Sequence, residues 1–387
     1  MNMKYKLKDI FDLQMGKTPS RNHTEYWNTK EHKWISIADL TKTGKYISET
    51  KECLSDCAID DSGIKVIPVN TVVMSFKLSI GKTAITVEDM YSNEAIMAFH
   101  DKHVAEILPE YIYYMFKYKN WDEGSNKAVM GKTLNKATLS EVEIDICSLE
   151  EQREIVKVLD KMMTVLGSRE TELSLLDDLI KARFVEMFGD ENNSKNWDVV
   201  NVEEVADVQV GVVIKPSQYY TDKSEGVRTF RSLNIGAGFI KDIDWVYFTK
   251  EGHQKNSKSI LKKDDLLIVR SGAPGTACVV TEEYAGCNAV DIIIAHPDCK
   301  KVNPYYLCTF TNMPHGKKQI DEGIGGAAQQ HFNVGKYNKL QLMLPPKALQ
   351  DEFVGFVKQV NKSKVAVQKA FDETQKLFDS LMQRYFG

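Results

Sequence analysis

The sequence lacks the features that mark several classes of protein. No run approaches the roughly 18–20 consecutive apolar residues of a membrane-spanning helix, and the first residues lead into no apolar signal-peptide core. The seven cysteines include no C-x-x-C pair, so neither a zinc ribbon nor a disulfide framework is predicted. Basic residues are not in excess, because 50 Lys and Arg face 54 Asp and Glu. We therefore expect a cytoplasmic protein with reduced thiols, in which any nucleic-acid-binding surface is local.

Motifs for catalysis and cofactor binding are also missing. The Gly-Lys-Thr triplets at 16–18, 81–83 and 131–133 lack the glycine five residues earlier that a phosphate-binding P-loop needs. No G-x-G-x-x-G follows a strand-like segment, as a dinucleotide-binding fold requires. The eight histidines show no metal-ligand spacing, and no Ser, His and Asp set stands out. The sequence therefore predicts a chain that is not an enzyme, with no catalytic residue, cofactor or metal.

What the sequence does contain is an internal repeat over almost its whole length. Leu-Gln-Met-Gly, ending at Gly16, reappears as Val-Gln-Val-Gly, ending at Gly211, a shift of 195 residues. After a three-residue insertion the shift becomes 198, and the match continues to the last residue. One copy runs from about 5 to 189 and the other from about 199 to 387, with the polar segment 190–196 as linker.

Each copy changes character along its length. The first part contains short β-rich runs punctuated by Gly, Pro and Asn, which is typical of a compact α+β domain. The last part carries apolar side chains at alternating spacings of three and four, which is typical of a coiled coil. We therefore predict a first α+β domain at 1–148, a central long helix at 149–189, a linker with a second domain at 190–346, and a C-terminal long helix at 347–387.

The long helices need a partner for their apolar seam. Each would be roughly 55–60 Å long at 1.5 Å per residue, and 8 of 10 seam positions in each are apolar. Because two copies of one unit associate readily about a twofold axis, we predict two tandem α+β domains in pseudo-twofold arrangement, separated by two long helices that form an antiparallel coiled coil. The alternative is that each helix lies on its own domain. The residues predicted for the coiled-coil or partner surface are Ile155, Leu159, Met162, Leu166, Leu173, Leu176, Ile180, Phe353, Val357, Val360, Val367, Phe371, Phe378 and Leu381.

Basic and amide-rich loops occur in both α+β domains. Lys and Arg in such loops can neutralise DNA phosphates and set the register of a protein on the duplex. The forked side chain of Arg suits the guanine edge, and the amides of Asn and Gln suit the adenine edge. Solvated loops have a similar composition, but recurrence in both copies favours contact with DNA. The predicted DNA-binding residues are Lys17, Arg21, Asn22, Lys132, Asn135, Arg231, Asn234, Lys258, Arg270, Gln329, Gln330 and His331.

This arrangement resembles the specificity (S) subunit of type I restriction-modification enzymes. The resemblance is carried by Gly16-Lys17-Thr18-Pro19, by the Leu-Glu-Glu-Gln-Arg-Glu-Ile run at 149–155 that starts a long helix, by Arg270-Ser271-Gly272, and by Pro345-Pro346 before Gln350. It implies two target-recognition domains, each reading one half of a bipartite site in double-stranded DNA, separated by helices that set the spacing. It also implies two methyltransferase (modification) subunits docked through the helices, joined by restriction and motor subunits in the full complex. The methyl donor and ATP would then be bound by these partners, which agrees with the missing motifs, and no membrane is involved.

Differences between the copies indicate where bases are read. If the domains read unlike half-sites, residues shared by the two copies, such as Gly16 and Gly211, should be framework. Arg231 corresponds to Ser36 in the first copy, and because the two residues differ, Arg231 is a candidate reader. Two domains on the same face of the duplex should have centres about one helical turn apart, roughly 34 Å, or a multiple of it.

Two other functions remain open from the sequence. The first is a tandem-repeat protein-interaction scaffold without DNA binding, whose binding curve would ignore salt, whereas phosphate contacts give a steep salt dependence. The second is a self-sufficient modification enzyme, which would require methyl transfer by this chain alone.

Overall fold

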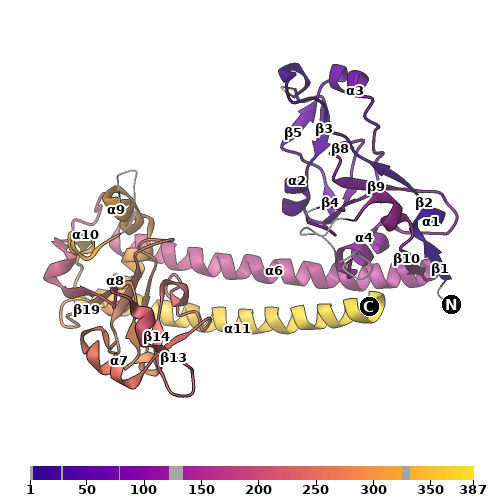
Figure 1. Ribbon diagram of the computed structural model, residues 1–387. Coiled ribbons are helices and arrows are strands. Elements are labelled where there is room, and N and C mark those ends of the chain that lie inside the picture. Colours follow the sequence, from indigo (N-terminus) through magenta and orange to yellow (C-terminus); the bar gives the residue numbers. More distant parts are fainter. Residues whose placement is uncertain (1–2, 28, 78, 122–133, 325–331) are drawn as a thin grey trace. The chain divides into compact units, whose positions relative to one another are not determined.

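The structure of the protein is a computed structural model that describes residues 3–27, 29–77, 79–121, 134–324 and 332–387 (Figure 1). The chain divides into two compact units. Unit 1 comprises Met1–Glu170 and Lys369–Gly387, and unit 2 comprises Thr171–Gln368. Each unit therefore holds one α+β domain with a segment of both long helices. Within the described ranges, no helix combines the length and apolarity needed to cross a membrane.

The α+β domain of unit 1 is built on three sheets. Its strands are β1 (Met3–Lys6), β2 (Phe11–Met15), β3 (His32–Ile35), β4 (Tyr46–Ile47), β5 (Glu52–Leu54), β6 (Val72–Ser75), β7 (Thr83–Thr86), β8 (Tyr91–Ser92), β9 (Ile96–Asp101) and β10 (Glu143–Ile146). Its helices are α1 (Leu7–Ile10), η1 (Thr24–Tyr26), α2 (Ile37–Lys42), α3 (Asp56–Ser62), α4 (Pro109–Tyr118) and α5 (Lys136–Ser140). The largest sheet has the order β2-β9-β6-β7-β4, beside a sheet β5-β3-β8 and a ribbon β1-β10. The five-stranded sheet is antiparallel except for the parallel pair of β4 and β7.

Strand β6 shows how the five-stranded sheet is packed. Successive side chains of a strand point to opposite faces, and all four residues of β6 are buried. Val72 and Met74 join the apolar cluster that includes α4, whereas Val73 joins the cluster on the opposite face. Because the sheet is covered on both faces, its strand sequence is a continuous apolar run rather than an alternating one.

Unit 2 repeats this design. Its strands are β11 (Val199–Asn201), β12 (Ala206–Val210), β13 (Tyr220–Thr221), β14 (Val227–Phe230), β15 (Val246–Phe248), β16 (Leu266–Val269), β17 (Ala277–Val279), β18 (Asn288–Ala289), β19 (Ile292–Pro297) and β20 (Gln341–Met343). Its helices are η2 (Val202–Glu204), η3 (Pro216–Tyr219), η4 (Ser232–Asn234), α7 (Lys250–Lys255), η5 (Ser257–Ser259), η6 (Glu282–Tyr284), α8 (Pro304–Asn312), α9 (Pro314–Ile324) and α10 (Val334–Asn338). The sheets have the orders β12-β19-β16-β17, β13-β15-β14-β18 and β11-β20. Strand β16 corresponds to β6, since Leu266 and Ile268 face one apolar cluster and Leu267 and Val269 face another.

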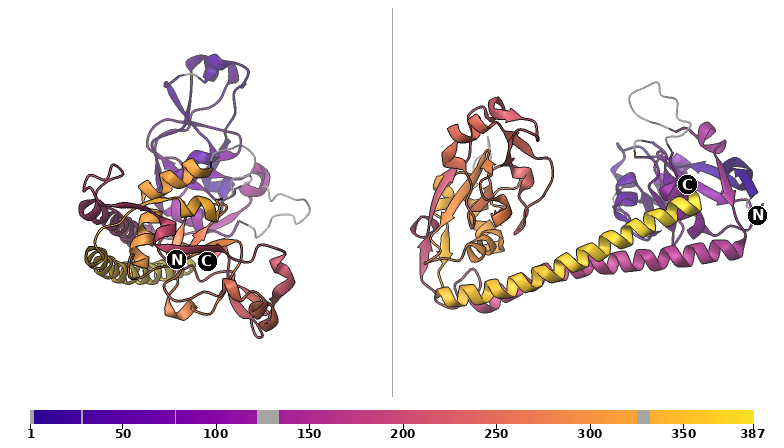
Figure 2. Two further views of the ribbon diagram at one scale, coloured as in Figure 1. Left: turned by 90° about the vertical axis from the view of Figure 1, so that its left-hand side faces the viewer. Right: turned by 90° about the horizontal axis from the view of Figure 1, so that it is seen from below.

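The two long helices are α6 (Leu149–Phe188) and α11 (Lys347–Phe386). Within unit 2 they lie side by side and run in opposite directions (Figure 1 and Figure 2). Phe184, near the end of α6, packs against Phe353, near the start of α11, with ring centroids 5.5 Å apart. Asp177, earlier in α6, pairs with Lys364, farther along α11. The helices are therefore antiparallel in this unit.

In unit 1 the long helices share one core with the domain. Leu159 and Leu166 of α6, Phe378 of α11 and Tyr114 of α4 belong to a single apolar cluster. All the seam positions predicted from the sequence are buried or partly buried. The helices thus lie both on each other and on their own domain, so the two arrangements considered from the sequence coexist. The predicted α+β fold class with two domains and a pair of long helices is confirmed.

A buried glutamine joins α6 to the domain of unit 1. Gln152 is completely buried. Its side-chain oxygen accepts a hydrogen bond from the Leu108 N–H (2.9 Å), and its amide nitrogen donates to the carbonyl oxygens of Glu106 and Cys147 (both 2.9 Å). Three backbone groups before and after α4 are therefore tied to the first turn of the long helix.

Gln350 plays the same part at the start of α11 in unit 2. It is also completely buried. Its oxygen accepts from the Asn303 N–H (2.8 Å), and its nitrogen donates to the carbonyl oxygens of Lys301 (3.3 Å) and Pro345 (2.8 Å). We call Gln152 and Gln350, with these partners, the glutamine clamps.

Candidate nucleic-acid interface

Several loops of unit 1 meet at one edge of the five-stranded sheet. Strands β2 and β6 end there, and β9 and β7 begin there, because these neighbours are antiparallel. The Gly16 N–H donates to the Ile96 carbonyl oxygen (3.1 Å), and the Leu134 N–H donates to the Phe76 carbonyl oxygen (3.2 Å). We call these loops, residues 16–23, 76–77 and 79–82 with Leu134, the sheet edge of unit 1.

Unit 2 builds the same edge from corresponding residues. The Gly211 N–H donates to the Ile292 carbonyl oxygen (2.9 Å), and the Phe332 N–H donates to the Arg270 carbonyl oxygen (3.1 Å). Strands β12 and β16 end at this edge, and β19 and β17 begin there. We call these loops, residues 211–219 and 270–276 with Phe332, the sheet edge of unit 2.

Glycine is required where each edge begins. A Cβ on Gly16 would lie 2.2 Å from the carbonyl oxygen of Asn93, and a Cβ on Gly211 would lie 2.5 Å from that of Ala289. Both distances are far below a van der Waals contact, so the backbone approach in each unit depends on the missing side chain. These two residues are framework, and the chemistry of each edge lies in the side chains that follow them.

Three predicted DNA-binding residues lie in the loop after β2. Lys17 is exposed, and its ammonium group donates to the Ser62 carbonyl oxygen. Arg21 forms a two-pronged ion pair with Glu52, with distances of 2.6 and 3.1 Å, and its guanidinium lies 3.6 Å from the centre of the Trp27 ring. Asn22 is exposed beside it. Because the Arg21 side chain is about half exposed at 49%, a phosphate or a guanine edge could replace Glu52 as the acceptor of its guanidinium.

Asn135 has a structural role that the sequence did not indicate. It follows Leu134 at the sheet edge of unit 1, and its side chain is the N-cap of α5, accepting from the Thr138 N–H at 2.8 Å. An N-cap that is used in this way stabilises the helix start. Lys132, the other residue predicted in this segment, lies outside the described residues.

Asn234 holds a loop of unit 2 through its side chain. It is completely buried. Its side-chain oxygen accepts from the Arg231 N–H (2.9 Å), and its nitrogen donates to the Ile243 carbonyl oxygen (2.6 Å). The amide therefore fixes the loop after β14, and contact with DNA would require that loop to open. Arg231 is partly exposed, and its guanidinium donates to the Asp244 carbonyl oxygen in the same loop.

Arg270 is also held by the protein. Its guanidinium pairs with Asp291, and its Nε donates to the Phe332 carbonyl oxygen at 3.3 Å. Only 16% of its side chain is exposed, so it positions the sheet edge of unit 2 rather than presenting a free fork. Gln329, Gln330 and His331, predicted in the segment just before Phe332, lie outside the described residues.

Lys258 lies beside β12, close to the sheet edge of unit 2. It belongs to η5, and its carbonyl oxygen accepts from the side chain of Gln209, in the fourth position of the five-residue strand β12 (2.6 Å). The residue is exposed. An exposed lysine at this place is suited to a backbone phosphate.

Carboxylates contact residues of both edges, in different surroundings. In unit 1 the pKa of Glu94 is lowered, mainly by a hydrogen bond from the Thr18 hydroxyl. In unit 2 the carboxylate is Asp291, which Arg270 pairs. A partly buried cation, Lys317, lies below loop 270–276 and donates to the Pro274 carbonyl oxygen (3.1 Å), and burial lowers its pKa. The two edges therefore share a backbone plan but not a charge pattern.

The comparison with known families decides the assignment. Residues 2–173 and 194–374 each match the type I restriction modification DNA specificity domain. The chain belongs to this family. The resemblance seen in the sequence is confirmed, and so is a role in DNA target recognition within type I restriction-modification. Specificity is a non-catalytic task in these systems, so the prediction that the chain is not an enzyme is confirmed as well.

Relatives of this type I specificity chain cover its whole length. It is 22% identical over 403 residues to the MjaIX specificity subunit of Methanocaldococcus jannaschii, spanning 98% of this chain and 91% of that one. The solved S subunit of M. genitalium has a TM-score of 0.57 at 14% identity, covering 100% of this chain and 96% of that chain. A chain from a structure on assembly and conformational transition of the type I R-M system has a TM-score of 0.63 at 15% identity, covering 100% and 97%. At these identities the solved structures support the fold.

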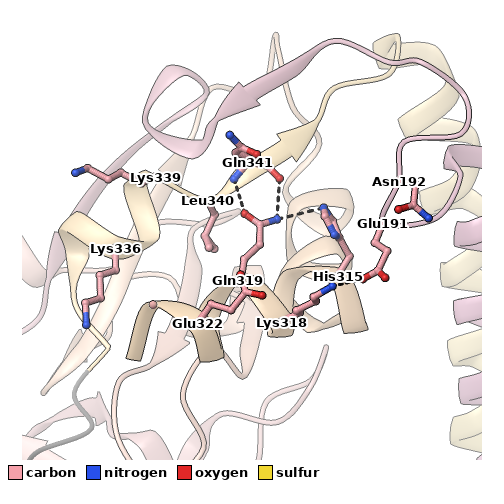
Figure 3. Close-up of a pocket in the computed structure, with 11 residues that line it drawn as sticks. Glu191, Asn192, His315, Lys318, Gln319, Glu322, Lys336, Lys339, Leu340 and Gln341 are labelled. Carbon is pink, nitrogen blue, oxygen red and sulfur yellow. Dashed lines mark hydrogen bonds and ion pairs between the residues drawn. The ribbon is translucent and has the colours of Figure 1, made fainter. Parts of the chain in front are cut away.

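A cavity in unit 2 of this specificity chain lies apart from the predicted contacts. It has a volume of about 530 Å³ and lies between the linker, α9, α10 and β20 (Figure 3). Gln319 bridges His315 (3.2 Å) and the backbone of Gln341 (2.8 and 3.1 Å), and Lys318 pairs with Glu191 (3.2 Å). Of the predicted DNA-binding residues that the structure describes, none lines it. His315, Lys318 and Gln319 of α9 therefore bind other groups of the lining.

Sequence reasoning about this specificity chain missed two features. The first is the contact between the Trp27 ring and the Arg21 guanidinium, two residues of one loop. The second is the pair of glutamine clamps. The sequence held a signal for the clamps, since Gln152 and Gln350 correspond under the shift of 198 residues, but burial and the three backbone partners of each appear only in the folded chain.

Proposed function

We propose that this chain recognises a bipartite site in double-stranded DNA, with the domain at 1–148 reading one half-site and the domain at 190–346 reading the other. The observation that carries the proposal is the pair of sheet edges, which share backbone hydrogen bonds and glycines but differ in side chains. A common framework with different side chains is what two readers of unlike sequences need.

The proposed DNA contacts follow from the placement of the predicted residues. We keep as contacts the residues that are exposed, partly exposed or outside the described ranges, namely Lys17, Arg21, Asn22, Lys132, Arg231, Lys258, Gln329, Gln330 and His331. Asn135, Asn234 and Arg270 hold loops, so we assign them to the support of the interface. The chain has a net charge of −4, so affinity for DNA depends on these local groups and on partner subunits.

The long helices are the proposed docking surface for two methyltransferase subunits, which restriction and motor subunits join in the full complex. The seam residues themselves are largely enclosed, so the partner surface must lie on the outward faces of the helices. Exposed apolar side chains occur there in both units: Val165 (37%) of α6 in unit 1, and Leu175 (62%) and Leu179 (47%) of α6 in unit 2. Apolar side chains that recur along an exposed helix are typical of a protein interface. Because DNA is the proposed partner, the expected cytoplasmic location is part of this proposal.

The proposal is tested by co-purification and methylation mapping. The chain is expressed with the methyltransferase encoded beside it, the complex is isolated, and methylated bases in genomic DNA are mapped with and without the chain. We expect a split motif that appears only when the chain is present. A stable complex with an unchanged methylation pattern would instead favour the protein-interaction scaffold, whose partner binding would be insensitive to salt.

A second prediction concerns spacing. Inserting seven residues into both α6 and α11, between Glu170 and Thr171 and between Gln368 and Lys369, keeps the heptad phase and adds about 10.5 Å to each helix. If the helices set the distance between half-sites, the spacer should lengthen by about 3 base pairs at 3.4 Å per step. Methylation mapping measures the spacer, and an insertion in α6 alone, which disrupts seam pairing, is the control. An unchanged spacer with both insertions would remove the helices as the determinant of spacing.

A further inference from the structure

The loop after β12 presents an apolar side chain directly to solvent. Ile214 is 81% exposed, the highest value among the large apolar side chains of the described residues, and Val213 beside it is 47% exposed. A single exposed apolar residue is ordinary on a protein surface. Two adjacent exposed apolar residues at the sheet edge of unit 2, where DNA contact is proposed, raise the question of which partner covers them.

The backbone holds Ile214 outward. The next residue, Lys215, has φ +43° and ψ 55°, a left-handed conformation that is unfavourable for a residue with a side chain and more so before a proline such as Pro216. The start of the loop is fixed, because the Val212 N–H donates to the Ala289 carbonyl oxygen (2.8 Å) and the Asp291 N–H donates to the Val212 carbonyl oxygen (3.1 Å). A strained turn maintained by fixed neighbours is typical of a functional position.

Further apolar side chains flank the same edge. The loop after β14 carries Leu233, Phe239 and Ile243, which are 53%, 54% and 50% exposed. This loop is joined to the start of β17 by the Gly238 N–H, which donates to the Ala277 carbonyl oxygen (2.8 Å). The apolar groups therefore lie on both sides of loop 270–276.

The corresponding loop of unit 1 has a different chemistry. Under the shift of 195 residues, Val213 and Ile214 correspond to Thr18 and Pro19. Thr18 donates its hydroxyl to Glu94, and Pro19 is buried. An exposed aliphatic side chain at this place is thus a property of the second domain alone.

We propose that Ile214 reads the C5 methyl group of a thymine in the half-site of the domain at 190–346, an inference that rests on the proposed function. The thymine methyl is the apolar group that base pairs present in the major groove, and apolar side chains recognise it by contact. Asn234 and Arg270 are used to hold loops, and the exposed amide of Gln218 at this edge donates to the Ile214 carbonyl oxygen (3.4 Å). Apolar contact by Ile214 gives the domain a means of selecting an A·T pair that does not depend on them.

The experiment compares thymine with uracil, which lacks only the C5 methyl group. The motif is mapped first, and the half-site of the second domain is assigned by exchanging domains. Binding of the complex of this chain with its methyltransferase is then measured on duplexes in which each thymine of that half-site is replaced in turn. For the natural chain we expect one replacement to weaken binding about fourfold, the value for losing one buried methyl group. For Ile214→Ala we expect weaker binding to the thymine duplex and no further loss with uracil.

Matched controls separate this effect from general ones. Val104→Ala removes an equally apolar, 57% exposed side chain from the loop after β9 in unit 1, and it should keep the full response to uracil. Replacements in the other half-site should affect the natural chain and Ile214→Ala equally. Because Ile214 is exposed, its truncation should leave folding intact.

Each outcome bears on one proposal. If the natural chain directs no split motif, the proposed function fails before Ile214 is tested. If the motif is present but Ile214→Ala keeps its response to uracil, or if the half-site holds no thymine on either strand, the inference about Ile214 is wrong. Loss of methyltransferase co-purification with an unchanged response to uracil would show that a protein covers this surface, which also overturns it.

Discussion

A complex containing a chimera in which residues 1–148 come from another member of the family is expected to methylate a motif that is altered in one half only. Each base pair that no longer matches costs about 1–3 kcal/mol of binding, roughly 5–150-fold per position. Two or more changed positions should therefore abolish methylation at the original site. The other half of the motif should be unchanged, because the domain at 190–346 is untouched.

The fold of unit 1 favours a junction at this place. Helix α6 begins at Leu149, directly after the exchanged segment. Gln152 binds only backbone groups of the domain, at Glu106, Leu108 and Cys147, so a foreign domain with the same backbone path can satisfy it. The donor domain must also supply an apolar surface for Leu159, which is completely buried in the core of unit 1.

The measurement is methylation mapping with the natural chain, with the chimera, and with a reciprocal chimera exchanged at 190–346. The reciprocal chimera should change the other half of the motif. A chimera that alters both halves, or neither half, while still forming the complex would contradict the assignment of one domain to each half-site.

Replacing Gln350 with Leu is expected to destabilise unit 2 by about 2–5 kcal/mol. The substitution leaves the Asn303 N–H and the carbonyl oxygens of Lys301 and Pro345 without their partner at a completely buried position. A buried backbone group that loses its hydrogen bond costs about 1–3 kcal/mol. The effect is large against the total stability of a domain, which is about 5–15 kcal/mol.

Thermal unfolding and amide hydrogen exchange measure this effect. The melting of unit 2 should fall by about 10 °C, and the Asn303 amide should lose protection. The Leu108 amide, held by Gln152 in unit 1, should keep its protection and serves as an internal reference. Gln359→Leu on the exposed face of α11 is the matched control, with an expected change within about 0.5 kcal/mol. Unchanged protection at Asn303 would show that the glutamine clamp does not hold the domain to the helix.

Predictions from the sequence succeeded where the signal is local and repeated. The seam of the long helices depends on a spacing of three and four residues, which any stretch of chain displays by itself. The internal repeat revealed two domains, because a repeat is visible in the sequence even when the contacts within each domain are not known. Roles of single side chains depend on contacts that the sequence does not display. Asn234 was predicted to read bases because amides suit adenine, yet its amide binds the Ile243 carbonyl oxygen inside its own loop.

The sequence by itself determined the family, the α+β class, the duplication and the long helices, since these follow from order, spacing and periodicity. Only the tertiary structure decided which polar side chains are free at the sheet edges. Arg270 is engaged by Phe332, 62 residues away, and by Asp291, 21 residues away, and no local pattern encodes such pairings. The same holds for Ile214, whose sequence neighbours resemble a strand interior but whose side chain is exposed at 81%. Exposure depends on which distant segments pack beside a residue, and that is settled only when the chain is folded.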